Sequence, residues 1–357
     1  MKGKKEVKVL VCLSGGVDSS VAAHLLVQDG YSVVGAYMKQ WSDSKDVAGV
    51  CTWKEEWRDA QRVAAHIGIP LITLDFEKEY KDMVVEYMFS EYTKGRTPNP
   101  DILCNKWIKF GFWRKKAQEL GFDIIATGHY ANIKQTKTGT YELRNAKDKN
   151  KDQTYFLHQL NQEQLSSTLF PLGEYTKNTI REIAKKAHLP TAEKEESMGI
   201  CFIGKVSMKD FLQQRIPKCP GNIVTTTGKI IGTHDGVAFY TIGQRHGFAQ
   251  DGGDDPFFVI KKNTQTQELV VGHKNDPARF VTEQELVEVH YISGQEPEFP
   301  LQCKVRTRHR QTLQPCTLFK KNNTHILQFN MPQVSVTPGQ FAVLYKNDSC
   351  LGGGIIA

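Results

Sequence analysis

Two residues with reactive side chains, Asp101 and Cys104, stand three positions apart in the stretch GRTPNPDILCN at residues 95–105. Its two prolines favour a rigid, extended loop, and Asp101 can cap or open the helix that we expect to follow. Cys104 would then lie in the first helical turn, where the helix dipole lowers the pKa of a thiol. Asp101 would lie on the same side and could exchange protons with a reacting group. A buried structural cysteine is the alternative, and this stretch alone does not decide between the two.

A second stretch, SGGVDSS at residues 14–20, has the composition of an anion site. A short, apolar, β-branched strand is expected at residues 9–13, and a helix is expected to begin at Ser19 and to end near Gly30. A glycine turn between a strand and a helix leaves backbone N–H groups free to bind phosphate at the positive end of the helix dipole. The stretch lacks the Gly-Lys-Ser/Thr of a Walker loop and the spacing G-x-G-x-x-G. An ordinary tight turn is the alternative.

Another cysteine, Cys201, lies between Gly199 and Gly204 in an apolar segment. Flanking glycines would let the backbone move, which suits a cysteine that swings between two partners. Taken alone, the segment reads equally well as a core strand that contains a cysteine.

Cations are concentrated in three stretches. Lys106, Lys109 and Lys116 fall roughly on one face of the helix expected after Cys104, and the polar loop 146–156 is rich in lysine. Near the C-terminus, cations alternate with other residues, which would place four of them on one strand face: Lys304, Arg306, Arg308 and Arg310. Solvated surface is the usual role of such charges, but like charges along one strand repel each other, which favours a polyanionic partner. The same alternation points His309 to the opposite face.

The elements that must position these residues follow an alternating pattern. Strands are expected at residues 9–13, 31–38, 71–74 and 123–127, with helices between them at 19–30, 59–67 and 80–92. This order predicts a parallel sheet with helices on both faces, which binds ligands beyond the carboxyl ends of its strands. We therefore expect Met38 and Gly128, which fall at such ends, to line an adenine and ribose pocket. Core packing is the alternative for Met38.

The composition changes after about residue 208. Short strands are expected at residues 223–226, 229–231, 237–241 and 257–260, and from residue 281 the pattern is all strands and turns, as in a small β-barrel. We therefore expect a catalytic domain at residues 1–208, a small central domain at 209–280 and a C-terminal barrel at 281–357.

The overall composition sets limits on the class of protein. The 357 residues carry a formal net charge of +7, which permits a polyanionic partner without requiring one. No run of about 18 apolar residues indicates a membrane span, and no apolar segment follows the N-terminal lysines as in a signal peptide. The eight cysteines include no C-x-x-C pair, so we expect no zinc or iron–sulfur site and no tightly bound metal. Dispersed cysteines suit reduced thiols, so we expect a cytoplasmic protein, with a monomer as the default.

Six motifs together resemble the bacterial tRNA-specific 2-thiouridylases, the MnmA or TrmU family. They are SGGVDSS, GRTPNPDILCN, ATGHY, KDQ, GICFIG and the tail CLGGGII, in that family's order and over nearly the whole chain. SGGVDSS by itself resembles the PP-loop of ATP pyrophosphatases. The resemblance implies an α/β parallel-sheet catalytic domain of the PP-loop kind (adenine nucleotide alpha hydrolase-like, Rossmann-like). A small, mainly β central domain and a C-terminal β-barrel that contacts tRNA would follow it.

The resemblance also implies a reaction. ATP would adenylate the C2 oxygen of the wobble uridine in glutamine, lysine and glutamate tRNAs. Sulfur from a cysteine persulfide would then replace that oxygen, with release of AMP and pyrophosphate. A cysteine desulfurase or a sulfur-relay protein would supply the sulfur. Mg²⁺ would accompany ATP, with Asp18 as a candidate ligand.

Residue roles come with the matched motifs. Cys201 would carry the persulfide, and Cys104 would cleave it or resolve it through a transient Cys104–Cys201 disulfide. Asp101 would act as general acid or base. ATP would be bound by Cys12, Leu13, Ser14, Gly15, Gly16, Val17, Asp18, Ser19, Met38 and Gly128. The target base would be contacted by Asn99, Pro100 and Asp101, and tRNA by Lys151, Asp152, Gln153, Arg308 and His309.

One flank departs from the family pattern, and other functions stay open. The family usually has Asp-Ser-Thr-Gly or Asp-Ser-Gln-Gly before Ile-Cys, where this chain has ESMG at residues 196–199. Another PP-loop enzyme that activates a small molecule would not need the two cysteines. An iron–sulfur tRNA thiolase is disfavoured because a C-x-x-C pair is missing. A nonenzymatic tRNA-binding protein is disfavoured because the phosphate motif is intact.

Overall fold

The computed structural model describes residues 3–39, 52–195, 207–245, 247, 255–322 and 324–357. Its N-terminal part is built on a parallel five-stranded sheet in the order β3-β2-β1-β4-β7. The strands are β1 (Lys8–Cys12), β2 (Ser32–Lys39), β3 (Leu71–Asp75), β4 (Ile124–Ala126) and β7 (Thr168–Leu169). The predicted α/β parallel sheet is therefore confirmed. The central strand β1 ends at the glycine-rich loop.

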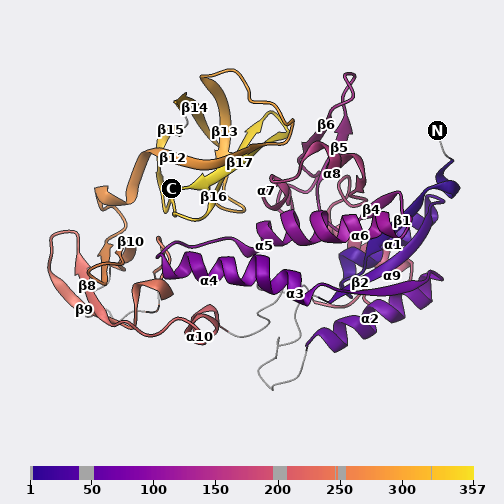
Figure 1. Ribbon diagram of the computed structural model, residues 1–357, viewed down its shortest axis with the longest axis horizontal. Coiled ribbons are helices and arrows are strands. Elements are labelled where there is room, and N and C mark those ends of the chain that lie inside the picture. The colour runs from indigo at the N-terminus through magenta and orange to yellow at the C-terminus, as the bar shows by residue number, and fades with distance from the viewer. Residues whose placement is uncertain (1–2, 40–51, 196–206, 246, 248–254, 323) are drawn as a thin grey trace.

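Helices cover both faces of this sheet (Figure 1). Side chains alternate along β1: Val9 and Val11 face a cluster formed with α1 (Val17–Gln28) and α2 (Thr52–Ile67), whereas Leu10 faces the opposite cluster. This alternation is the period-two rule for a strand buried on both faces. Two long helical segments, residues 77–93 and 100–119, contribute to the opposite cluster.

Each of these two long segments contains a stretch of wider, π-type winding. The first consists of α3 (Glu77–Tyr80), the π-helical stretch Lys81–Val85 and α4 (Glu86–Thr93). The second consists of α5 (Pro100–Leu103), the π-helical stretch Cys104–Trp113 and α6 (Arg114–Glu119). Stretches of π-helix are rare and often accompany functional sites.

Shorter helices complete the domain. They are α7 (Thr154–Leu157), α8 (Gln162–Ser166) and α9 (Lys177–Lys186). A 3-10 turn at Lys4–Glu6 precedes β1 at the start of the described chain. The strand β7 at Thr168–Leu169 follows α8 almost directly, and its two residues pair with β4.

The central part holds a four-stranded sheet in the order β10-β11-β8-β9. Its elements are α10 (Met208–Gln213), β8 (Gly221–Thr225), β9 (Ile230–His234), β10 (Phe258–Asn263) and β11 (Glu268–Gly272). The strand expected at residues 237–241 is wrong: Val237–Phe239 forms a 3-10 turn, because Gly236 adopts φ +148° and accepts a hydrogen bond from the Phe239 N–H. In Figure 1, α4 runs from the parallel sheet toward this part, and Phe89 stacks on Phe211 where α4 meets α10.

The C-terminal part is a closed barrel, as expected, entered by a 3-10 turn at Pro277–Arg279. Its strands follow the order β12-β15-β14-β13-β16-β17, and β12 pairs with β17 to close it. They are β12 (Phe280–Tyr291), β13 (Leu301–Arg306), β14 (Gln314–Lys321), β15 (Thr324–Val334), β16 (Phe341–Lys346) and β17 (Ser349–Ile356).

A hairpin of the N-terminal part extends the barrel sheet. It consists of β5 (Asn132–Gln135) and β6 (Tyr141–Arg144), and β6 pairs with β17 through Cys350↔Leu143. The two parts therefore share backbone hydrogen bonds, which fixes their relative orientation.

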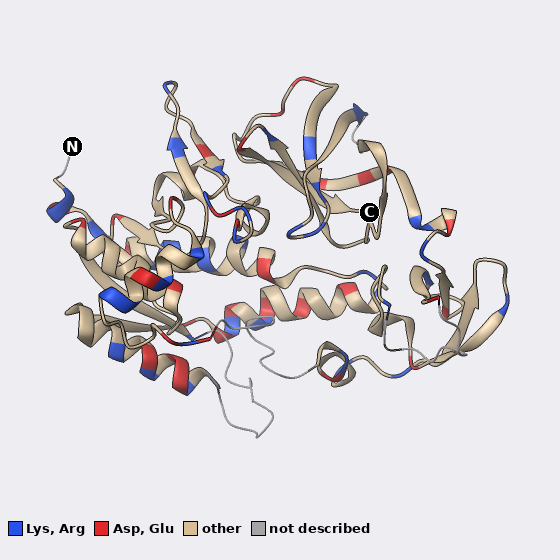
Figure 2. Ribbon diagram, turned by 180° about the vertical axis from the view of Figure 1, so that it is seen from behind, with Lys and Arg blue, Asp and Glu red and all other residues tan. Residues whose placement is uncertain are grey.

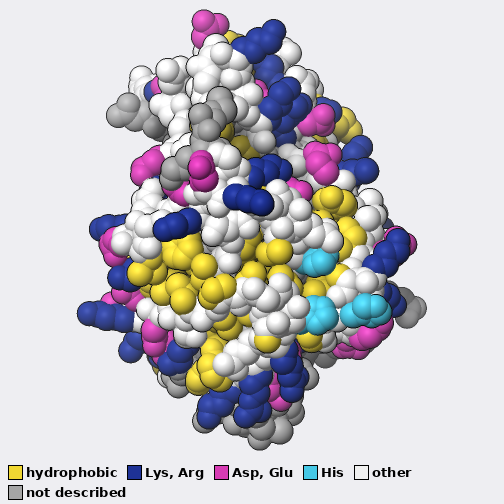
Figure 3. Space-filling model, turned by 90° about the vertical axis from the view of Figure 1, so that its right-hand side faces the viewer, with side chains coloured by type: hydrophobic (Ala, Val, Ile, Leu, Met, Phe, Trp, Pro, Cys, Tyr) yellow, Lys and Arg dark blue, Asp and Glu magenta, His cyan; other side chains and the backbone are white. Residues whose placement is uncertain are grey.

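The surface shows both charged and apolar regions. On the side that carries the N-terminus, hydrophobic side chains gather in a patch that Lys and Arg surround (Figure 3). Within the described ranges, none of the helices combines the length and apolarity that a membrane span requires.

Candidate active site

A cavity of about 290 Å³ opens beside the glycine-rich loop, at the carboxyl ends of the sheet strands. Eight of the residues predicted to bind ATP line it: Cys12, Leu13, Ser14, Gly16, Asp18, Ser19, Met38 and Gly128. Gly15 does not line it, and Val17 lines a neighbouring cavity instead. Residues that are far apart in the sequence are thus brought together around one hollow of nucleotide size.

The loop keeps its shape through glycine conformation and side-chain hydrogen bonds. Gly15 adopts φ +73°, and a Cβ at this position would collide with the backbone oxygen of Glu56. The Ser19 hydroxyl donates to the Gly16 carbonyl over 3.0 Å and lies 3.2 Å from the Ser14 N–H, which donates to it. At Gly128 a Cβ would lie 2.8 Å from the Ser19 N, so a glycine allows the end of β4 to approach the helix N-terminus.

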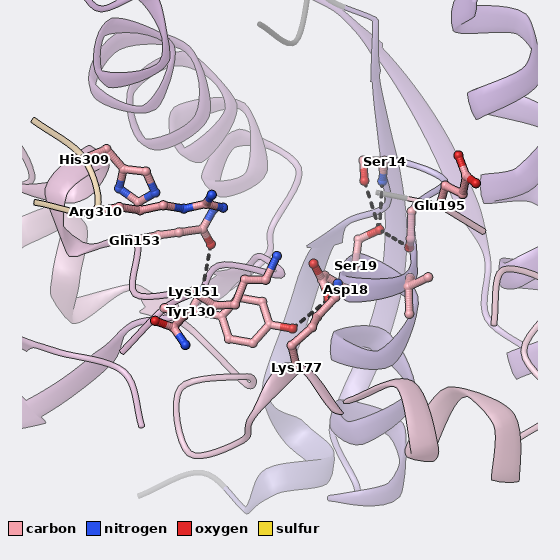
Figure 4. Close-up of a pocket in the computed structure, with 13 residues that line it drawn as sticks. Ser14, Asp18, Ser19, Tyr130, Lys151, Gln153, Lys177, Glu195, His309 and Arg310 are labelled. Atoms are coloured by element: carbon pink, nitrogen blue, oxygen red, sulfur yellow. Dashed lines mark hydrogen bonds and ion pairs between the residues drawn. The ribbon is translucent and has the colours of Figure 1, made fainter. Parts of the chain in front are cut away.

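A second cavity of about 300 Å³ adjoins the first (Figure 4). Asp18 lies at the boundary, and its Oδ1 accepts hydrogen bonds from Lys177 Nζ at 2.7 Å and from the Tyr130 hydroxyl at 2.8 Å. Lys151, Lys177 and Arg310 also line this cavity. Figure 4 shows Arg310 reaching in beside Gln153 from the barrel, opposite the Ser14 loop. The two cavities together offer backbone N–H groups and cations along one path, which suits a chain of phosphates.

Several other residues that line the cavities were not predicted to do so. They are Tyr37, Glu56, Thr127, His129 and Lys194 in the first cavity and Tyr130 and Lys177 in the second. Thr127, His129 and Tyr130 belong to the ATGHY motif, which was the available signal for them. Burial raises the pKa of Glu56, and the Lys194 ammonium opposes that shift.

Lys194 also donates to the Gly15 carbonyl over 3.0 Å and pairs with Asp59. Tertiary packing brings Glu56, Lys177 and Lys194 to the loop.

Lys109 joins the nucleotide cavity to the predicted proton donor. It lines the first cavity and lies on the helical segment that carries Asp101 and Cys104. Burial raises the pKa of the Asp101 carboxyl, and the Lys109 charge lowers it in part. Burial likewise lowers the pKa of His129 well below its usual range, with Lys109 adding to that shift. Lys109 was predicted to lie on a basic helix face, and this pattern was the available signal that Lys109 contributes to the site.

The environment of Cys104 differs from the sequence prediction. The helix begins at Pro100, and Asn99 caps it by accepting from the Ile102 N–H over 3.3 Å, so Asp101 is not the cap. Cys104 is therefore the fifth helical residue, beyond the first turn, and the expectation of a first-turn thiol is wrong. With 2% of its surface exposed, Cys104 packs in the core cluster with Leu103 and Ile108. The full effect of a helix dipole is limited to the first turn.

The barrel holds the loop that precedes Cys104. Gln340 Nε2 donates to the carbonyls of Thr97 and Pro98 over 2.8 and 3.1 Å, and the Asn99 amide donates to Gln340 Oε1 over 3.4 Å. The Asn99 side chain thus forms hydrogen bonds within the protein through both its amide nitrogen and its amide oxygen. A target-base contact by Asn99, Pro100 and Asp101 stays a prediction.

The predicted tRNA contacts fall into different environments. Lys151, Gln153 and His309 line the second cavity, whereas Arg308 is exposed. Asp152 is almost fully buried, and its Oδ2 accepts from Arg306 Nη1 over 2.8 Å. His309 packs on Phe156 with ring centroids 4.4 Å apart, and burial, followed by the charges of Arg310 and Arg306, lowers its pKa to about 4.

The four alternating cations do not share a strand face. β13 ends at Arg306, and residues 307–310 form a turn, so only Lys304 and Arg306 belong to the strand. The turn forms because the Thr307 N–H and hydroxyl both donate to the Gln311 side chain, and Arg310 adopts φ +65°. The prediction is therefore wrong for Arg308 and Arg310.

Two predictions, the role of Cys201 and the absence of a tightly bound metal, can be compared with the structure only in part. Cys201 lies outside the described residues, and so does its predicted disulfide with Cys104. Within the described ranges, no group of three or more His, Cys, Asp or Glu side chains could hold a metal ion. Asp18 lines both cavities, whereas the carboxylates of Glu56 and Glu195 each line one of them. Such a dispersed set fits Mg²⁺ bound mainly through phosphate oxygens and water.

Comparisons with known proteins identify the family. Family models match residues 7–205 (tRNA methyl transferase HUP domain), 209–273 (tRNA methyl transferase PRC-barrel domain) and 282–356 (Aminomethyltransferase beta-barrel domain). The tRNA-specific 2-thiouridylase MnmA of Streptococcus sanguinis is 46% identical over 364 residues, which cover 100% of this chain and 96% of that protein. A 2-thiouridylase named MnmA 1 from Geobacillus kaustophilus is 47% identical over 356 residues, covering 99% and 96%.

Among solved structures, the U34-tRNA thiolase NcsA of Methanococcus maripaludis is 16% identical and covers 60% of this chain and 65% of that one. Its TM-score with this chain is 0.38. Because the 2-thiouridylase relatives are 46–47% identical over nearly their full length, the chain belongs to the tRNA-specific 2-thiouridylase family and is a tRNA sulfurtransferase.

Proposed function

We propose that this chain converts the wobble uridine of glutamine, lysine and glutamate tRNAs to 2-thiouridine. ATP adenylates the C2 oxygen, which releases pyrophosphate and makes AMP the leaving group. The terminal sulfur of a Cys201 persulfide then attacks C2, and AMP departs with the former C2 oxygen. The Cys104 thiolate then attacks the Sγ atom of Cys201. This breaks the S–S bond to the sulfur that C2 now carries, so the thiolated uridine leaves and a Cys104–Cys201 disulfide forms, which an external reductant must reopen.

One observation carries this proposal: a single continuous helical segment, residues 100–119, bears the thiol, the proton donor and a cation of the nucleotide cavity. Asp101 and Cys104 lie at its start, and Lys109 lines the cavity beside the glycine-rich loop. A rigid helix fixes the spacing between these groups, which is the requirement for displacing an activated oxygen from C2 with a sulfur nucleophile.

The proton and phosphate chemistry can be assigned to residues of the chain. Because burial raises its pKa, Asp101 holds a proton at higher pH than an exposed aspartate and suits general acid–base work. Asp18 would hold Mg²⁺ together with phosphate oxygens, and the ion would neutralise charge on the phosphates when bound. Lys151, Lys177 and Arg310 would face the phosphate chain from the second cavity.

A basic groove supports RNA as the substrate. A cavity of about 900 Å³ lies between the β5–β6 hairpin, the loop 145–152 and β13. Its cations are Lys134, Arg144, Lys147, Lys149, Lys304 and Arg306, and its acids are Asp152, Glu174 and Asp348. Figure 2 shows Lys and Arg on the hairpin and on the barrel strands across from it. An excess of cations along a groove fits the phosphate backbone of RNA.

The proposal extends to partners and location. A cysteine desulfurase or a relay protein charges Cys201 with sulfur, and the enzyme works in the cytoplasm as a monomer that binds one tRNA. Reduced cysteines and a basic surface are consistent with these assignments.

Nucleoside mass spectrometry tests the proposal. Unmodified glutamate tRNA is incubated with the protein, Mg-ATP and a persulfide donor, and 2-thiouridine is quantified. Wild type is expected to thiolate position 34, Cys104→Ser and Cys201→Ser are expected to lose the product, and Cys219→Ser, at an exposed cysteine, serves as the matched control. Consumption of ATP by wild type without tRNA thiolation would instead support another PP-loop activity.

A further inference from the structure

Two cysteines that the proposed reaction does not use face each other in the barrel. Cys303 of β13 pairs directly with Cys316 of β14 in the antiparallel register. Their Sγ atoms lie 3.6 Å apart, and both residues are free thiols. The other described cysteines are Cys12, Cys104, Cys219 and Cys350.

The backbone already has the geometry of a disulfide. Directly opposed residues of antiparallel strands have Cα atoms about 4.5–5.5 Å apart, within the range of about 4.4–6.8 Å that disulfides span. The sulfurs need only rotate about their χ1 angles to close from 3.6 Å to a bond of about 2.0 Å. No strand has to move.

The two thiols differ in ways that assign them complementary roles. Cys303 is half-buried, whereas Cys316 is only 3% exposed. The hydrogen bond between the two thiols lowers the pKa of Cys303 against the opposing effect of burial, and Lys346 lowers it further. The same hydrogen bond raises the pKa of Cys316. Cys303 is thus the accessible nucleophile, and Cys316 is the resolving thiol behind it.

The position of the pair connects it to the candidate active site. Cys303 and Cys316 are the middle of the five register pairs of the β13–β14 hairpin, whose turn carries Arg308, His309 and Arg310. His309 and Arg310 line the cavity next to the glycine-rich loop. A covalent bond two pairs from the turn would restrict the hairpin that presents these side chains.

We propose that Cys303 and Cys316 form a redox-active dithiol, distinct from the pair used in sulfur transfer, that oxidises to a disulfide and pins this hairpin. A low-molecular-weight disulfide is the oxidant. The Cys303 thiolate attacks one of its sulfurs and releases a small thiol, and Cys316 then loses its proton and displaces the second small thiol from the mixed disulfide. Two electrons pass from the protein thiols to the oxidant, which leaves as two thiols. This proposal does not depend on the thiolation chemistry.

The test uses the full-length chain with Cys104→Ser and Cys201→Ser, so that the predicted catalytic disulfide cannot form. The protein is incubated with oxidised glutathione, remaining thiols are alkylated, and non-reduced peptides are mapped by mass spectrometry. A linked peptide pair that contains Cys303 and Cys316 is expected. With Cys316→Ser added, Cys303 is expected to keep a glutathione adduct. With Cys303→Ser added, Cys316 is expected to stay unmodified because it is buried.

The exposed Cys219 provides an internal reference for reactivity. If Cys219 takes up glutathione while Cys303 and Cys316 are both recovered alkylated, the dithiol proposal is overturned. Hydrogen exchange then tests the hairpin: at least twofold slower exchange of amides 307–311 is expected on oxidation, and no change in the Cys316→Ser variant. A disulfide that forms without slowing this exchange would overturn the claim that it pins the turn.

Discussion

At the scale of single residues, the site depends on the partly buried carboxyl of Asp101, whose ionised form is disfavoured by loss of solvent. Burial raises the pKa of Asp101, so the folded chain binds its proton more tightly than the unfolded chain does. The free energy of unfolding therefore falls as pH rises from about the ordinary value of 3.8 through the folded-state pKa, and stays lower above it. Each pKa unit corresponds to about 1.4 kcal/mol.

Asp101→Asn should remove that penalty. We expect the variant to be at least as stable as wild type at pH 7, with an advantage that disappears below about pH 4, and to lose thiolation by about 100-fold or more. Urea unfolding between pH 3 and 8 and single-turnover assays measure the two effects. Asp82→Asn, at an exposed position, is the control. An Asp101→Asn protein that is less stable at every pH would contradict the assignment.

A second prediction concerns the cation that orients Asp18. Lys177 is 10% exposed and pairs with Asp18 over 2.7 Å, so Lys177→Met leaves a carboxylate beside the phosphates without its ammonium partner. We expect the KM for ATP to rise about tenfold and the free energy of unfolding to fall by about 1–3 kcal/mol. Lys185→Met is the matched control on the same helix, since its ion pair with Glu193 is exposed and such pairs contribute little. Equal effects of both substitutions would show that Lys177 has no special role.

At the scale of elements, the glycine-rich loop fits against the backbone of α2. Gly15→Ala combines a positive φ with a collision against the Glu56 carbonyl, whereas Gly30→Ala has a similar φ of +85° and open space around it. Both variants should lose about 1–2 kcal/mol of stability to backbone strain. Only Gly15→Ala should also weaken ATP binding, by about tenfold or more, measured by calorimetry. If Gly15→Ala binds ATP as Gly30→Ala does, the contact with α2 does not shape the loop.

The elements also show what sequence alone can predict. The parallel sheet, the loop after β1 and the hollow around Ser14, Met38 and Gly128 follow from apolar periodicity and glycine placement, which are local signals. The end of β13 was missed because the hydrogen bonds of Thr307 to Gln311 replace the strand, although the alternation of side chains continues. Cys104 was placed two positions too early in its helix because Asn99 rather than Asp101 caps that helix.

At the scale of the whole molecule, the barrel completes the site. Strand β6 pairs with β17, Arg306 of the barrel pairs with the buried Asp152, and Gln340 holds the loop before Cys104. Each of these contacts joins residues more than 150 positions apart. No pattern in a single sequence reports such distances, so the roles of Gln340 and Arg306 could be found only in the structure.

The same arrangement creates the basic groove between the β5–β6 hairpin and β13, and this groove leads to the last prediction. Lys134 and Lys304 stand on its opposite walls, so replacing either with glutamate should weaken tRNA binding without affecting ATP binding. Each lost phosphate contact should reduce the slope of log K against log salt by about 0.7–0.9.

Lys229→Glu, in the turn between β8 and β9 and outside the groove, is the control of equal charge change. Fluorescence anisotropy with unmodified tRNA over a series of KCl concentrations measures the slopes. If all three variants share one slope with wild type, the RNA backbone follows another path. A smaller slope for Lys134→Glu and Lys304→Glu alone would mean that RNA spans both walls and is held by the catalytic domain and the barrel together.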